Sequence, residues 1–182
     1  AALTALLDTL TPQFLALPKE LLALIPPKAY GDTDGRESFQ SRNGLAFDPL
    51  SAAEASANHT LSLLLHPQRL NRLSSQQQLD ALLATVIKHT LQQDAGSDAA
   101  GLIHQRVSHV AFYQLMQSLN SADLAPEARA TLRAQLTQLG KQLQKRDDGT
   151  AQLLSGQWQH YLQHGSWQPV FIPKQLPPGA PI

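Results

Sequence analysis

Apolar residues recur at helical spacing along most of the chain. One stripe repeats every third or fourth position, as the buried face of an amphipathic helix does: Leu79, Leu82, Leu83, Val86, Ile87 and Leu91. Similar stripes run through residues 1–10, 49–66, 98–119, 126–143 and 150–165. The pattern predicts an all-α fold, either an antiparallel helical bundle or an irregular helical stack, with about six to eight helices.

Capping and proline signals predict where these helices begin. Asp48 followed by Pro49 is typical of a helix start, and Ser51 with Glu54 offers a capping box one turn later. Only one of these two positions can be the true start of the helix. Ser75 is a candidate cap for the next long helix, and Gly165 is a candidate end for the last one.

Two segments break the helical pattern. Residues 28–47 are rich in turn formers and predict one long loop. Residues 166–182 are rich in proline and predict an extended tail. We therefore expect a single helical domain over 1–165 and a partly docked tail, with the stretch Trp167–Ile172 packing near Trp158 and Tyr161.

Charge and composition exclude several classes of protein. Lys plus Arg and Asp plus Glu are both 14, so the net charge is zero, which disfavours nucleic-acid or anionic-membrane binding by bulk charge. The absence of cysteine excludes disulfides, thiol nucleophiles and cysteine zinc sites. The longest apolar run, Leu21–Ile25, is too short to span a membrane. The chain begins without Met inside a Leu-rich pattern, and we interpret it as a fragment of something longer.

The histidines offer no complete metal site. His160 and His164 lie four residues apart and can face the same way, but a stable zinc site needs a third protein ligand. The position after the first histidine holds Tyr161 instead of the glutamate of a zinc-peptidase helix. An amphipathic surface pair is the favoured interpretation, and no catalytic, cofactor-binding or metal-ligating residue is assigned.

Two groups of arginines are candidates for a contact or an anion site. Arg36 and Arg42 lie in the long loop, where they can order the loop through salt bridges or contact a ligand carboxylate or another domain. The structural role is favoured. Arg69 and Arg72 with His66 make a small basic spot, which we interpret mainly as a solvated helix face.

Several stretches taken in order carry a resemblance. They are residues 21–27 (LLALIPP), 41–53 (SRNGLAFDPLSAA), 61–73 (LSLLLHPQRLNRL) and 177–182 (PPGAPI). Together they resemble the C-terminal helical region of a family of large bacterial zinc-dependent metalloproteases, in which domains of unknown function surround a metzincin-like catalytic core.

The resemblance implies a non-catalytic accessory domain that packs against the catalytic domain of its own chain. It further implies that zinc is held in that catalytic domain, that the parent protein is a hydrolase acting on peptide or protein substrates, and that it is periplasmic or extracellular. No cofactor is expected in this fragment, because the His-Glu-x-x-His helix of the family is absent from it. The alternative is a free-standing helical module that binds a peptide or protein between its helices.

Overall fold

The computed structural model describes residues 39–40, 46–47, 49–73, 75–92 and 99–167. Its elements follow in the order β1 (Phe39–Gln40), β2 (Ala46–Phe47), α2 (Pro49–Leu64), α3 (Pro67–Asn71), α4 (Gln76–Thr90), α5 (Ala99–Asn120), α6 (Pro126–Leu143) and α7 (Gly149–His164). Within these residues five helices are 15 to 22 residues long, and α3 has only five residues. The predicted all-α fold is confirmed.

The helix ends follow the capping signals. Ser75 caps α4 by accepting a hydrogen bond from the Gln78 amide, and Gly165 ends α7 in the left-handed region with φ of 66°. The α2 helix begins at Pro49, so the first of its two possible starts is the right one. Asp48, the cap expected there, lies outside the described residues.

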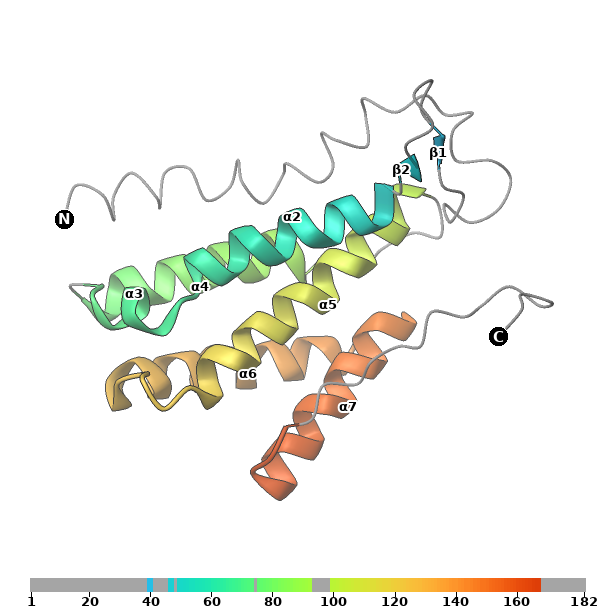
Figure 1. The fold of residues 1–182 in the computed structure, drawn as a ribbon. Coiled ribbons are helices and arrows are strands. Elements are labelled where there is room, and N and C mark those ends of the chain that lie inside the picture. The colour runs from blue at the N-terminus through green and yellow to red at the C-terminus, as the bar shows by residue number, and fades with distance from the viewer. Residues whose placement is uncertain (1–38, 41–45, 48, 74, 93–98, 168–182) are drawn as a thin grey trace.

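The long helix α5 is the centre of the arrangement and contacts α2, α4, α6 and α7 (Figure 1). Sequential neighbours α4 and α5 run antiparallel (Figure 1), and Thr90 at the end of α4 accepts a hydrogen bond from Ser108 in the first half of α5. The α2 and α5 helices instead run in the same direction, because Asn58 pairs with Gln114 and Leu65 with Ser118. The result is an irregular stack rather than a purely antiparallel bundle.

The core is built from the stripes that the sequence displays. Every member of the α4 stripe is buried, and so are the four leucines of α6 from Leu132 to Leu143. The largest side chains that are almost fully covered include Trp158, Phe112, Leu61, Leu83, Leu115 and Met116. One continuous cluster therefore joins α2 through α7.

The α6 and α7 helices come close together at a glycine. A β-carbon placed on Gly140 of α6 would lie 2.4 Å from Cδ1 and 2.9 Å from Nε1 of Trp158 on α7. The Trp158 ring in turn stacks on Tyr161, with centroids 5.4 Å apart. The missing side chain at position 140 is therefore what lets the indole lie against the α6 backbone.

One expectation needs revision. The predicted loop 28–47 contains an antiparallel pair, β1 with β2, in the register Phe39 to Phe47 and Gln40 to Ala46. The turn formers between them predict a loop, but they are also the residues that connect short antiparallel strands. Trp167, at the start of the tail, packs against the core, and its ring lies against Tyr113 of α5 with centroids 5.2 Å apart. Docking of residues 168–172 lies outside the described residues and stays a prediction.

Candidate functional site

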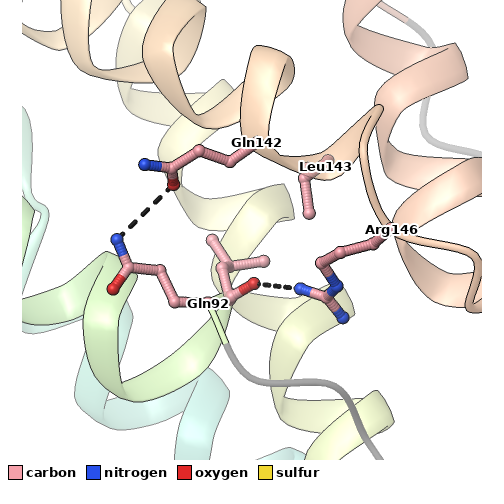
Figure 2. A pocket seen from close by; sticks show the side chains of 5 residues that line it. Gln92, Gln142, Leu143 and Arg146 are labelled. Atoms are coloured by element: carbon pink, nitrogen blue, oxygen red, sulfur yellow. Dashed lines mark hydrogen bonds between the residues drawn. The ribbon is translucent and has the colours of Figure 1, made fainter.

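A hollow lies where the C-terminal ends of α4 and α6 meet (Figure 2). It has a volume of about 320 Å³ and is lined by Leu91, Gln92, Gln142, Leu143 and Arg146. We call it the Gln92–Gln142 hollow, because the two amide side chains face each other across it. The Gln92 Nε2 donates to Gln142 Oε1 at 3.5 Å, which is long for a hydrogen bond and leaves both amides able to take other partners.

Arg146 forms one wall of the hollow and connects the end of α4 with the start of α7. Its Nη1 donates to the Leu91 carbonyl at 2.6 Å, at the end of α4. Its Nε and Nη2 donate to the two carboxylate oxygens of Asp148 at 2.7 and 2.9 Å. Asp148 also accepts from the Ala151 amide at 2.9 Å and so caps α7. One guanidinium therefore joins the end of α4 to the start of α7.

In this wall the positive charge of Arg146 is paired with the negative charge of Asp148. Burial acts to raise the pKa of Asp148, but the hydrogen bonds from Arg146 and from the Ala151 amide outweigh it, so the pKa is lowered. The carboxylate is thus charged at neutral pH and neutralises Arg146. The hollow consequently presents amide groups rather than a free charge, which suits a neutral, amide-bearing ligand such as a peptide backbone. Its volume lies near the lower end of the range for small-ligand sites, about 300–1,000 Å³.

Sequence reasoning did not find Arg146. The available signal was local, since an arginine two residues before a capping aspartate can pair with that aspartate. The contact with Leu91 had no sequence signal, because it joins residues 55 positions apart.

The arginines that sequence reasoning selected have two different outcomes. Arg36 and Arg42 lie outside the described residues, so a contact through them stays a prediction. The basic spot of Arg69, Arg72 and His66 is described. There the Arg69 Nη1 donates to the Leu64 carbonyl at 2.9 Å, and the His66 Nδ1 accepts from the Gln68 amide at 3.3 Å.

These two contacts show that the basic spot holds the α2–α3 junction. His66 caps α3 and lies beyond the end of α2, so the helix expected over the stripe 49–66 ends earlier, at Leu64. The group is therefore not simply the solvated helix face that the sequence suggested, because Arg69 is half-buried at a helix junction.

A zinc ion of the kind that the resemblance implies needs at least three protein ligands. Among the residues that the structure describes, no group of three His, Asp or Glu side chains is close enough to hold a metal ion. The His160 and His164 rings stack on each other with centroids 4.2 Å apart and lie exposed at the end of α7. These residues do not fit a catalytic zinc centre, and we assign no catalytic step to them.

His109 on α5 has a shifted pKa. Burial lowers the pKa of this imidazole, and the positive charge of Arg106 lowers it further. His109 lies half-buried on α5 and is therefore held neutral where an exposed histidine would begin to take up a proton. His109 therefore bears on how the stability of the fold depends on pH, and it is not among the residues that line the Gln92–Gln142 hollow.

Comparison with known proteins identifies a family. No helix in the described part of the chain is long and apolar enough to cross a membrane. No curated protein and no solved structure matches the sequence. A family model described as Met-zincin matches residues 1–100, which is more than half of the chain and includes α2, α3 and α4. The chain therefore belongs to the Met-zincin family.

Proposed function

We propose that this chain is a non-catalytic C-terminal helical domain of a bacterial zinc-dependent metallopeptidase, and that it packs against the catalytic domain of the same protein. The observation that carries the proposal is the family match over residues 1–100 in a sequence without His-Glu-x-x-His. That helix supplies two zinc ligands and the general base of such peptidases, so the chemistry must lie elsewhere in the protein.

The polar groups of the domain support a structural role. Arg146 and Arg69 each donate to a carbonyl at a helix end, and Arg129 does the same for Leu119 at the end of α5. Arg129 also donates to the Ser121 carbonyl at 2.7 Å in the α5–α6 turn. Guanidinium groups that satisfy helix ends in this way stabilise the stack, which supports the proposal of a structural domain.

The complete gene product tests this proposal. We expect it to contain a His-Glu-x-x-His sequence upstream of residue 1, to hold one zinc ion per chain, and to hydrolyse casein. Replacing the glutamate of that upstream motif with glutamine should abolish hydrolysis while zinc and folding remain. A gene that starts at or near residue 1 and lacks the motif would refute the proposal. Export to the periplasm or the cell exterior belongs to the same proposal and is tested by cell fractionation.

The alternative is a free-standing module that binds a peptide. The Gln92–Gln142 hollow favours it, because its two amide side chains can pair with a peptide backbone. Titration of unlabelled peptides against the ¹⁵N-labelled chain would shift the side-chain amide signals of Gln92 and Gln142 if this function is real. The variant Gln92→Ala should then weaken peptide binding, and Gln144→Ala, on the neighbouring turn, should not.

A further inference from the structure

We infer that His160 and His164 form a two-histidine chelate for a late first-row divalent metal ion, with Cu²⁺ bound more tightly than Ni²⁺ or Zn²⁺. The pair lies on the last turn of α7, outside the residues that the family model matches. The site is thus separate from any catalytic zinc and does not depend on the proposed function. Its remaining coordination positions are open to water.

The two rings are already side by side. They are four residues apart on one helix face, their centroids are 4.2 Å apart, and their planes are inclined by only 22°. Both side chains are exposed, so a hydrated ion can reach them without any rearrangement of the core. Because the planes are stacked, their in-plane lone pairs run nearly parallel, so both exposed side chains must rotate until one nitrogen of each ring points at the same ion.

The hydrogen bond of His164 fixes which nitrogen is available. Its Nδ1 lies 3.0 Å from the carbonyl oxygen of His160. A carbonyl oxygen can only accept, so Nδ1 must carry the proton, and in the neutral ring Nε2 keeps its lone pair. Histidines that bind metals commonly donate their other ring N–H to a carbonyl in this way, which orients the ring and raises its basicity.

The surroundings also hold the pair in place and favour a cation. Tyr161, between the two histidines, stacks on the buried Trp158 and anchors the last turn of α7 to the core. Gly165 then ends the helix, and its amide donates to the Tyr161 carbonyl at 2.8 Å. The histidines therefore lie at the negative end of the helix dipole, where a bound cation is stabilised.

Two neutral imidazoles determine which ions bind. Nitrogen ligands suit copper, nickel and zinc. The affinity of such a site rises from Mn²⁺ through Ni²⁺ to Cu²⁺, and Zn²⁺ binds less tightly than Cu²⁺. Two protein ligands are too few for a closed structural zinc site. We therefore expect an exchangeable ion that dialysis against a chelator removes.

The experiment is titration of the whole chain with CuCl₂, NiCl₂, ZnCl₂ and MnCl₂, each followed by calorimetry. We expect one Cu²⁺ per chain and the affinity order given above. Either His160→Gln or His164→Gln should weaken Cu²⁺ binding at least about tenfold, because each removes one point of a two-point attachment. His59→Gln is the matched control, since it removes one exposed helical histidine outside the pair.

Nitrogen NMR with Zn²⁺ provides a second readout at the atoms themselves. We expect the Nε2 signal of His164 to shift on zinc addition while Nδ1 keeps its proton. Unchanged Cu²⁺ affinity in both His160→Gln and His164→Gln would overturn the inference, as would coordination through Nδ1 of His164. Circular dichroism of each variant confirms that the helix is retained, so a loss of binding is not a loss of fold.

Discussion

A single methyl group added at Gly140 tests the packing of α6 against α7. In Gly140→Ala the new β-carbon would lie 2.4 Å from Cδ1 of Trp158, well inside contact distance, and the ring has little room to retreat because it is only 1% exposed. Overpacking of this kind lowers the free energy of unfolding by about 1–3 kcal/mol, whereas the higher helix propensity of alanine raises it by about 1 kcal/mol. Because 2.4 Å is far inside van der Waals contact, we take the upper half of the overpacking range, about 2–3 kcal/mol, so after the helix gain the free energy of unfolding should fall by about 1–2 kcal/mol.

Thermal and urea unfolding measure this loss. For a chain of this size it corresponds to a melting temperature about 2–8 °C lower. Gly156→Ala is the matched control on α7, because a β-carbon there would meet nothing within 4 Å and should stabilise the helix by up to about 1 kcal/mol. In a Trp158→Phe background, Gly140→Ala should be less destabilising, since the smaller ring leaves room. A Gly140→Ala protein as stable as the unsubstituted chain would refute the close approach.

Three further predictions concern pH, capping and the tail. Because the pKa of His109 is lowered in the folded state, first by burial and then by Arg106, the unfolded chain takes up this proton first, so stability should fall as the pH drops below about 6.5. His109→Gln should flatten that part of the pH–stability curve, and an unchanged slope would contradict the assignment. Asp148→Ala removes the cap of α7 and should cost about 0.5–2 kcal/mol, read as a lower urea midpoint, whereas an unchanged midpoint would show that the cap is dispensable. Protease cleavage between Gly165 and Lys174 should be slow and should lower the melting temperature, whereas rapid cleavage without that loss would mean that the tail does not dock.

Local features of the fold could be predicted from the sequence because their causes are local. The apolar period of α4 selects its buried face, and Ser75 and Gly165 mark helix ends through bonds to residues within four positions. These predictions do not depend on which helices become neighbours. They are confirmed for the described helices without any knowledge of the packing.

Features that join distant segments could not be predicted in this way. A stripe on α2 shows that one face is buried but not that its partner is α5 running in the same direction. The contact of Arg146 with Leu91 and that of Gly140 with Trp158 each depend on the final placement of two helices. The Gln92–Gln142 hollow, which exists only because two helix ends meet, was therefore invisible in the sequence.

Zinc content and casein hydrolysis, measured on this chain alone and on the complete gene product after dialysis against a chelator, test the central claim most directly. The account predicts that the complete protein retains one zinc ion per chain and hydrolyses casein, whereas the isolated chain retains no metal and leaves casein intact. The exchangeable ion proposed at His160 and His164 is removed by the dialysis and does not disturb the comparison. Hydrolysis by the isolated chain, or zinc that stays bound to it after dialysis, would contradict the assignment of a non-catalytic domain.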